Sequence, residues 1–232
     1  MKGKGFFQRL WNRLKRILII LFVAQLVYIV ALKWVDPPIT VTQLISFFSG
    51  YGLKRDYIKL NQMSSNARLA VIASEDQLFP DHNGFDIKSI EKALLNNSKK
   101  KTRVRGASTI SQQVAKNVFL WQGRSWARKG LEVYFTFMIE IIWGKERILE
   151  MYLNVAEMGK GIFGIEAASR AYFKKPAKKL SQSEAAKIAA CLPNPKVYRV
   201  NPPSSYITKR YPWVVRQMIN LEGDEELARF LK

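Results

Sequence analysis

Residues 105–118 read RGASTISQQVAKNV, a polar loop that leads into an amphipathic helix. Ser108 or Thr109 can cap this helix, and Ile110, Val114 and Val118 then recur on one face. Strand signals elsewhere are few, so the sequence predicts a mainly α fold with little sheet. The same kind of periodicity predicts further helices over residues 66–74, 87–94, 126–143, 145–154, 183–192, 206–221 and 224–231.

Two of these helices have specific boundary signals. Residues 181–184 (SQSE) form a capping box that opens one helix, and Pro193 closes it. Pro212 is expected near the start of another helix, because proline is best tolerated in the first turn.

The composition excludes several kinds of chemistry. The chain has 232 residues, of which 48% are apolar, and this is enough to bury a real core. Cys191 is the only cysteine, which excludes an internal disulfide, and His82 is the only histidine, which excludes a multi-histidine metal site. Any catalysis must therefore use carboxylates, hydroxyls, amides and cations.

Residues 17–35 (ILIILFVAQLVYIVALKWV) are almost wholly apolar. As a helix they span about 28 Å, close to the thickness of a bilayer core. A cleaved signal peptide is the alternative, but the segment ends without a convincing small-residue cleavage site. We therefore expect an uncleaved single-pass anchor in the inner (cytoplasmic) membrane. Six basic residues precede it and place the N-terminus in the cytoplasm and the rest in the periplasm: Lys2, Lys4, Arg9, Arg13, Lys15 and Arg16.

The sequence thus divides into four parts. Residues 1–16 are a basic cytoplasmic tail, 17–35 the transmembrane anchor, 36–62 a membrane-proximal linker, and 63–232 the catalytic domain. Within the linker, residues 39–53 (ITVTQLISFFSGYGL) could form a short strand and turn, a hydrophobic flap on the membrane, or ordinary core.

The net charge of +20 extends beyond the basic tail. A second basic run at 99–105 is either a solvated loop or part of a binding surface. An outward-facing basic domain favours anionic lipid headgroups or phosphorylated ligands, and nucleic acid is not expected as a partner.

Four polar clusters interrupt the predicted helices: residues 75–86 (EDQLFPDHNGFD), 106–117 (GASTISQQVAKN), 128–132 (RKGLE) and 145–154 (KERILEMYLN). Each cluster has an ordinary structural interpretation. In order, these are a polar helix end, a well-capped amphipathic helix, a surface ion-pair triplet and scaffold. Arg128, Lys129 and Glu132 in any case share one helix face.

Together and in this order, the four motifs resemble those of the peptidoglycan glycosyltransferases, glycosyltransferase family 51. The resemblance covers roughly residues 60–195, and the chain is similar to the monofunctional form. It implies a lysozyme-like, mostly helical domain with a membrane-proximal hydrophobic flap. It also implies an enzyme that transfers a lipid-linked glycan chain onto the GlcNAc 4-hydroxyl of lipid II. The bond formed is β-1,4, the anomeric configuration inverts, and polyprenyl pyrophosphate is released.

The resemblance also implies roles for individual residues. Glu75 matches the catalytic base, and Glu132 matches a second essential glutamate with an orienting role. Lys116, Arg128 and Lys129 match the cations that bind the pyrophosphate. Weaker matches make Ser108, Gln112 and Asn117 substrate contacts, while Asp76, Phe79 and His82 shape the first loop.

No cofactor is expected, because the sequence offers no clear ligand cluster, although a divalent cation could assist the pyrophosphate. The expected partners are lipid II, the lipid-linked glycan, the membrane and other cell-wall synthesis proteins. Two rival functions stay open. One is a lytic transglycosylase or muramidase that cleaves peptidoglycan, which would not need the cationic motifs. The other is a non-enzymatic membrane-anchored scaffold.

Overall fold

The computed structural model describes residues 3–99, 108–123 and 125–231, apart from the side chains of 3, 4, 94 and 96–99. The chain divides into two compact units, Met1–Asp36 and Pro37–Lys232. Most of the basic run, Lys100–Arg105, and Gly106 lie outside the described residues.

The first unit is one long helix, α1 (Gly3–Ala31). The helix begins within the predicted basic tail and ends before the predicted end of the apolar segment. Lysine and arginine are good helix formers, so the apolar helix continues backwards through them. The helical residues Gly5–Ala31 include an 18-residue window with a mean hydropathy of 2.2 and are long and apolar enough to cross a membrane, a property that signal sequences share.

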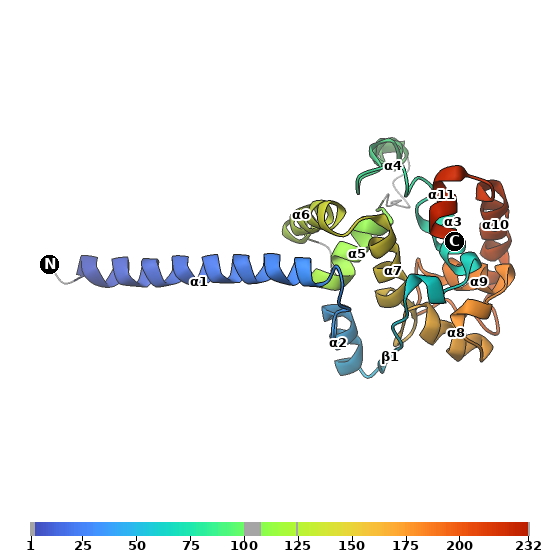
Figure 1. The fold of residues 1–232 in the computed structure, drawn as a ribbon, viewed down its shortest axis with the longest axis horizontal. Coiled ribbons are helices and arrows are strands. Elements are labelled where there is room, and N and C mark those ends of the chain that lie inside the picture. The colour runs from blue at the N-terminus through green and yellow to red at the C-terminus, as the bar shows by residue number, and fades with distance from the viewer. Residues whose placement is uncertain (1–2, 100–107, 124, 232) are drawn as a thin grey trace. The chain divides into compact units, whose positions relative to one another are not determined.

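The second unit confirms the mainly α prediction (Figure 1). The described residues form three short strands and two 3-10 turns, η1 (Leu60–Gln62) and η2 (Ala177–Lys179). The helices are α2 (Val41–Phe48), α3 (Ser65–Glu75), α4 (Ile87–Lys99), α5 (Ile110–Phe119), α6 (Trp126–Ile142), α7 (Lys145–Val155), α8 (Ile165–Phe173), α9 (Gln182–Cys191), α10 (Ser205–Leu221) and α11 (Glu225–Leu231).

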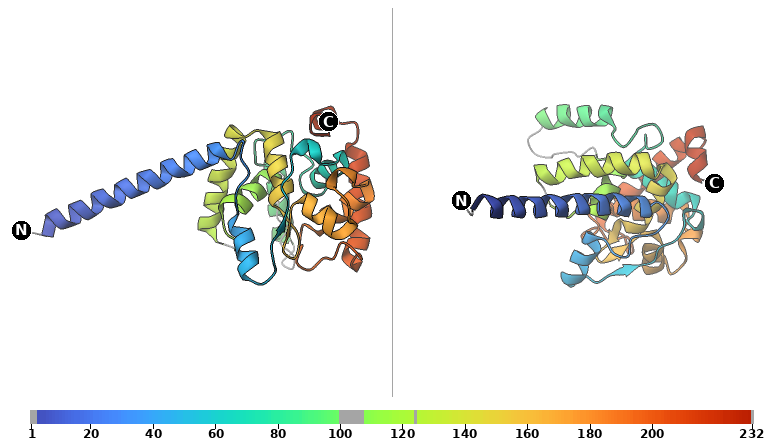
Figure 2. Two further views of the ribbon diagram at one scale, coloured as in Figure 1. Left: turned by 60° about the horizontal axis from the view of Figure 1, so that its bottom comes forward. Right: turned by 60° about the vertical axis from the view of Figure 1, so that its left-hand side comes forward.

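Two helix groups form the core of this unit. In one, α9 packs on α3 and α10, and α11 packs on α3. In the other, α5 packs on both α6 and α7. Figure 2 shows α10 and α11, in red, on the opposite side of the unit from α2, in light blue. Residues 147–155 of α7 are all buried, so this helix runs through the centre of the unit.

A small sheet lies beside α8. Its strands are β1 (Lys54–Arg55), β2 (Glu157–Gly159) and β3 (Ile162–Phe163), in the order β1-β3-β2. β1 runs parallel to β3, and β2 runs antiparallel to it. The turn between β2 and β3 depends on Gly161, which has a φ of +69°. A Cβ atom built there would lie 2.1 Å from the Tyr51 carbonyl oxygen.

Gly161→Ala is therefore expected to lower the free energy of unfolding. An alanine in this left-handed conformation costs about 1–3 kcal/mol before the contact with Tyr51 is counted. Gly130→Ala is the matched control, because Gly130 lies in α6 and a Cβ atom added there would meet nothing within 4 Å. That change should be stabilising by up to about 1 kcal/mol. Equal urea midpoints for the two variants would contradict this account of the turn.

One open alternative is settled, and one sequence prediction is wrong. Residues 41–48 form a helix, which excludes the short strand that was one of the possibilities for this segment. Thr40 and Gln43 complete a capping box that starts this helix. Pro212 lies inside α10 and not near its start. Proline removes one helical hydrogen bond, but burial of Ile207, Val214 and Met218 stabilises the helix on both sides of it.

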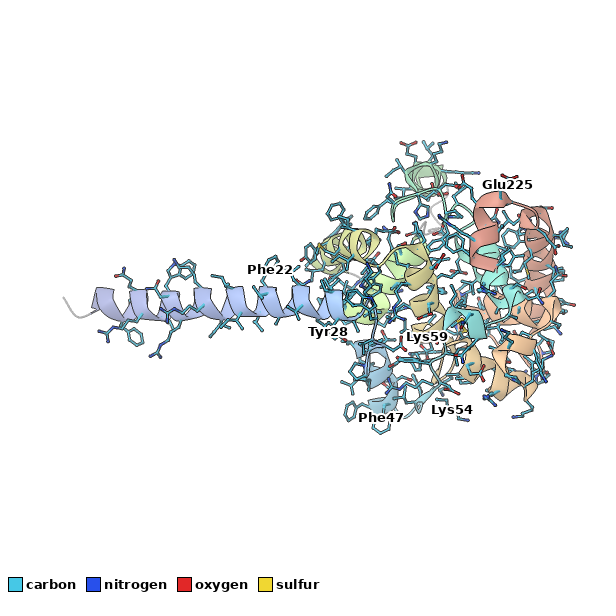
Figure 3. All side chains as sticks on the ribbon, viewed as in Figure 1. Phe22, Tyr28, Phe47, Lys54, Lys59 and Glu225 are labelled. Carbon is cyan, nitrogen blue, oxygen red and sulfur yellow. The ribbon has the colours of Figure 1, made fainter. Side chains whose placement is uncertain are left out.

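The α2 helix presents an apolar surface to solvent. Phe47 and Phe48 are 57% and 78% exposed, and Leu44 and Ile45 are each more than 40% exposed. Figure 3 shows Phe47 extending outward from α2. Of the three possibilities for residues 39–53, ordinary core does not describe these four side chains.

Candidate active site

The first motif is held together by Asp76. This residue is the C-cap that follows α3, and its Oδ2 accepts a hydrogen bond from the backbone N–H of Ile110, at the start of α5, at 2.9 Å. His82 Nε2 lies 2.9 Å from Asp76 Oδ1, and the Gly84 N–H donates to His82 Nδ1 at 3.1 Å. Because Nδ1 accepts, Nε2 carries the proton and donates it to Asp76. Asp76 therefore attaches the loop between α3 and α4 to the start of α5.

Phe79 packs beneath the same loop. It is fully buried, and its ring meets the rings of His82 and Phe230 at centroid distances of 6.4 Å and 5.7 Å. Lys145 Nζ donates to the His82 carbonyl at 2.5 Å and lies over the Phe79 ring. The three residues expected to shape this loop thus all lie within it or directly below it.

Glu75, the last residue of α3, has a defined carboxylate orientation. Ser74 Oγ donates to its Oε1 at 3.2 Å, and Gln113 Nε2 donates to its Oε2 at 3.0 Å. The Tyr152 hydroxyl in turn donates to Gln113 Oε1 at 3.1 Å. These contacts connect α3, α5 and α7 and hold the carboxylate in place.

The environment of Glu75 alters its acidity. Burial raises the pKa of its carboxyl group, and the neighbouring charge of Asp76 raises it further. The hydrogen bonds from Gln113 and Ser74 and the positive charge of Arg210 act in the opposite direction. The net effect is a pKa above the ordinary carboxyl value, which suits a group that must accept a proton.

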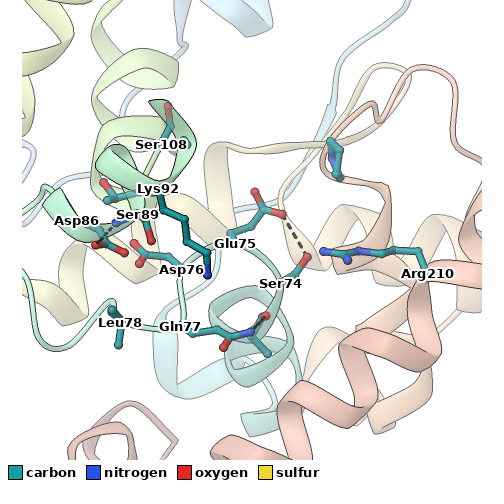
Figure 4. A pocket seen from close by; sticks show the side chains of 14 residues that line it. Ser74, Glu75, Asp76, Gln77, Leu78, Asp86, Ser89, Lys92, Ser108 and Arg210 are labelled. Atoms are coloured by element: carbon teal, nitrogen blue, oxygen red, sulfur yellow. Dashed lines mark hydrogen bonds between the residues drawn. The ribbon is translucent and has the colours of Figure 1, made fainter. Parts of the chain in front are cut away.

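Glu75 lines a cavity of about 690 Å³ (Figure 4). Asp76 and Ser108 also line it, and two further residues, Lys92 from α4 and Arg210 from α10, add positive charge. Ser108 is exposed and directly precedes Thr109, the N-cap of α5.

Three charged residues of α6 form a buried ion cluster. Arg128 Nη1 donates to Glu132 Oε2 at 2.6 Å, and Lys129 Nζ donates to Glu132 Oε1. Arg128 and Glu132 are buried, while the Lys129 side chain is 40% exposed. One carboxylate therefore orients two cations, and the cluster retains one positive charge. The predicted shared helix face is confirmed.

Lys116 is influenced electrostatically by both this cluster and Glu75. Burial is the largest cause that lowers its pKa, and the positive charges of Arg128 and Lys129 lower it further. Glu132 and Glu75 act in the opposite direction, so Lys116 is within electrostatic reach of all four. It forms no ion pair with any residue that the structure describes, so its ammonium group is available to an anionic ligand.

Lys116 and Asn117 line a second cavity, of about 320 Å³. Pro193 lines both cavities, and Gln113, which holds Glu75 from the first, also lines the second. The two cavities therefore adjoin, with Glu75 and Lys116 on either side of Gln113.

Several expected site residues line neither of these two cavities: Phe79, His82, Gln112, Arg128, Lys129 and Glu132. Gln112 is buried, and its Oε1 accepts the Thr109 N–H at 3.1 Å as part of a capping box. The sequence interpretation assigned Gln112 to substrate contact. In the structure, Gln112 instead helps to start α5. Its effect on a ligand would be to fix the helix that carries Lys116.

Of the residues at the site that were not predicted, Gln113 and Arg210 differ in how they could have been found. Gln113 had a usable signal, because it lies on the same face of α5 as Lys116 and Asn117. Arg210 had none, because it lies on α10, far along the chain from all four motifs.

The fourth motif serves mainly as scaffold, as predicted. The Asn154 side chain makes two hydrogen bonds to the backbone of Ile58, at 3.1 Å and 2.9 Å. Glu150 accepts the Leu60 N–H at 2.7 Å and pairs with Arg147. These contacts attach residues 58–60 to α7. Among the described residues, no group of three or more His, Cys, Asp or Glu side chains is arranged to hold a metal ion.

Comparison with known proteins shows the family to which this chain belongs. A protein-family model described as Transglycosylase matches residues 42–219, which include all four motifs. The biosynthetic peptidoglycan transglycosylase of Mannheimia succiniciproducens is 56% identical over 181 residues, 78% of this chain and 74% of that protein. The protein of the same name from Salmonella schwarzengrund is 55% identical over 180 residues, again 78% and 74%. That from Escherichia coli ATCC 8739 is 56% identical over 174 residues, 75% and 72%.

Proposed function

This chain belongs to the transglycosylase family and is a peptidoglycan transglycosylase, and on that premise we propose that it polymerises glycan strands from lipid II. The main observation behind the proposal is that the cavity lined by Glu75 adjoins the cavity lined by Lys116. One holds a half-buried, hydrogen-bonded carboxylate, Glu75. The other holds Lys116, a cation without an ion-pair partner among the described residues, beside the α6 ion cluster.

Glu75 acts as the general base. A sugar hydroxyl is a poor nucleophile, and removal of its proton in the transition state typically accelerates transfer about 10²–10⁴-fold. The hydrogen bonds from Ser74 and Gln113 orient the carboxylate, and its raised pKa strengthens it as a base. The acceptor is the GlcNAc 4-hydroxyl of lipid II.

The positive side chains stabilise the leaving group. Negative charge develops on the pyrophosphate as the anomeric bond breaks, and fixed cations at that point lower the barrier. Lys116, Arg128 and Lys129 take this role, with Glu132 holding the last two in position. They perform the neutralisation that a divalent cation could otherwise supply.

A single base and a single leaving group suit a direct displacement. The donor is α-linked to the diphosphate, so attack from the opposite face gives a β-1,4 bond with inversion. The products are a lengthened glycan and polyprenyl pyrophosphate. Glu75 and Glu132 need not act as a hydrolytic pair, because Glu132 is already committed to two cations.

The membrane determines where this chemistry occurs. Removing a polyprenyl chain from the bilayer costs about 0.8 kcal/mol per CH₂ group, so the active site must work at the membrane surface. We propose that α1 is a single-pass anchor in the inner membrane, with the second unit in the periplasm. The exposed apolar face of α2 contacts the outer leaflet. Other cell-wall synthesis proteins are the expected partners there.

The direct test compares two substrates. Purified protein in detergent is incubated with labelled lipid II, or with finished sacculi, and the products are separated on a gel. We expect polymer from lipid II and no solubilised fragments from sacculi. Fragments from sacculi without polymer from lipid II would favour the lytic rival, and neither product would favour the scaffold.

The pH dependence of polymerisation gives a further prediction. Activity requires Glu75 ionised and Lys116 protonated, so kcat/KM plotted against pH should be bell-shaped. The acid limb should lie above the ordinary glutamate range, because the pKa of Glu75 is raised, and the alkaline limb below that of an ordinary lysine, because the pKa of Lys116 is lowered. In Lys116→Arg the alkaline limb should move to higher pH, since arginine stays charged. A wild-type rate independent of pH would exclude these assignments.

A further inference from the structure

Arg210 belongs to none of the four motifs, yet it lines the cavity that holds Glu75. Figure 4 shows its side chain extending from α10 across the pocket toward Ser74 and Glu75. Its helix packs on α3, the helix that ends in Glu75. The two side chains are therefore presented to one another by a pair of packed helices.

The guanidinium group of Arg210 is held in place. Its Cζ lies 3.7 Å from the centre of the Trp213 ring, one turn further along α10. Its Nε is buried and has no hydrogen-bond partner among the residues that the structure describes. A stacked and partly desolvated guanidinium is favourable only where negative charge compensates for the lost hydration. Glu75 lines the same cavity and is influenced electrostatically by Arg210, so its carboxylate can supply this charge.

Other charged and titratable groups also lie near the Glu75 carboxylate, and the sum of their charges shows why the positive charge of Arg210 matters. Asp76 adds negative charge, while Tyr152 from α7 and Cys191 from α9 are buried with pKa values raised by burial, so they stay neutral. Lys116 from α5 also acts on Glu75 as a cation, but in the proposed reaction it binds the pyrophosphate. Once that anion is bound, Arg210 still supplies positive charge to Glu75.

Resting on the proposed function, we propose that Arg210 is a positioning residue for glycosyl transfer, which holds the Glu75 carboxylate ionised and oriented while the acceptor approaches. In that step the acceptor hydroxyl proton passes to a Glu75 oxygen, and the hydroxyl oxygen bonds to the anomeric carbon. The anomeric C–O bond breaks with its electron pair going to the pyrophosphate. Arg210 touches none of the reacting atoms and acts through Glu75.

The test is the pH profile of lipid II polymerisation for Arg210→Gln. Loss of the positive charge should make Glu75 harder to ionise and move the acid limb of kcat upward by about one pH unit. Activity should therefore fall about tenfold below the limb and largely recover above it, with KM for lipid II little changed. Arg210→Lys retains the charge and should keep the wild-type limb. Arg216→Gln, an exposed position on the same helix, is the matched control.

A loss of activity that is equal at every pH would overturn the inference, and so would a raised KM with an unmoved acid limb. Failure of the proposed function looks different. In that case wild-type protein makes no polymer, or Glu75→Gln polymerises normally, whatever Arg210 does.

A double-mutant cycle gives a readout that is independent of activity. Arg210→Gln should lower the thermal midpoint at pH 8 more in the wild-type background than in Glu75→Gln, where there is no carboxylate to lose. Equal losses in both backgrounds would overturn the pairing. Should Arg210→Gln fail to fold, Arg210→Met, which keeps the contact with Trp213, replaces it in both measurements.

Discussion

Glu75→Gln should lower the rate of lipid II polymerisation by about 10²–10⁴-fold, because a neutral amide cannot accept the acceptor proton. The amide keeps the shape of the carboxylate and can still pair with Ser74 and Gln113. The loss should therefore appear in kcat, with little change in KM for lipid II. It is measured as the initial rate of polymer formation on gels.

The same substitution should not weaken the fold. Burial raises the pKa of Glu75 in the folded state above its unfolded value. Stability from this group is then present below the unfolded pKa and is lost as the pH rises through the folded pKa. Glutamine has no such loss, so at neutral pH the thermal midpoint should equal or exceed that of the wild type. Glu225→Gln, on the surface of α11, is the control and should leave both rate and midpoint unchanged. A Glu75→Gln enzyme with near wild-type rates would remove the general base from the mechanism.

Lys116→Met should have the second largest effect, a loss of about 10²–10³-fold in kcat/KM, which is typical when one preorganised charge stabiliser is removed. The reason is that Lys116 forms no ion pair with a described carboxylate, so in the proposed reaction its charge would act on the leaving pyrophosphate. Methionine fills a similar volume, and burial already disfavours the charged lysine, so stability should be retained or should rise. Polymerisation rates and thermal midpoints are measured in parallel.

Arg128→Ala should act in the same direction as Lys116→Met but with a stability cost, because it removes one partner of the buried Glu132. The loss in lipid II turnover should still exceed the loss in stability.

The control for charge removal in Lys116→Met is Lys209→Met, which changes an exposed lysine on α10. A Lys116→Met enzyme that turns over lipid II normally would show that the cation cluster does not stabilise the leaving group.

The elements that sequence predicts best here are those whose signals are local. The capping boxes at Thr109–Gln112 and Ser181–Glu184 each span four residues, and each marks the start of a helix. Asp86 directly precedes α4 and accepts the Ser89 N–H at its start. In each case the side chain and its backbone partner are close in sequence, so composition and spacing are sufficient.

The features that sequence missed depend on contacts between distant residues. Arg210 reaches Glu75 only because α10 packs on α3, and nothing near residue 210 indicates that packing. Pro212 reads locally as a helix start, yet tertiary burial of Val214 and Met218 keeps α10 continuous through it. α8, which begins at Ile165, was not predicted either. The preceding residue, Gly164, has no side chain to cap the helix and instead allows a close approach to the Asn154 backbone.

The central claim is that one carboxylate and an adjoining cation cluster act on a diphosphate-linked sugar. The most direct measurement counts glycosidic bonds and released polyprenyl pyrophosphate in the same reaction, for wild type, Glu75→Gln and Lys116→Met. We predict one pyrophosphate released per bond in the wild type, with both products lost together in each variant. Glycosidic bonds formed without pyrophosphate release, or undiminished release in both variants, would contradict the account.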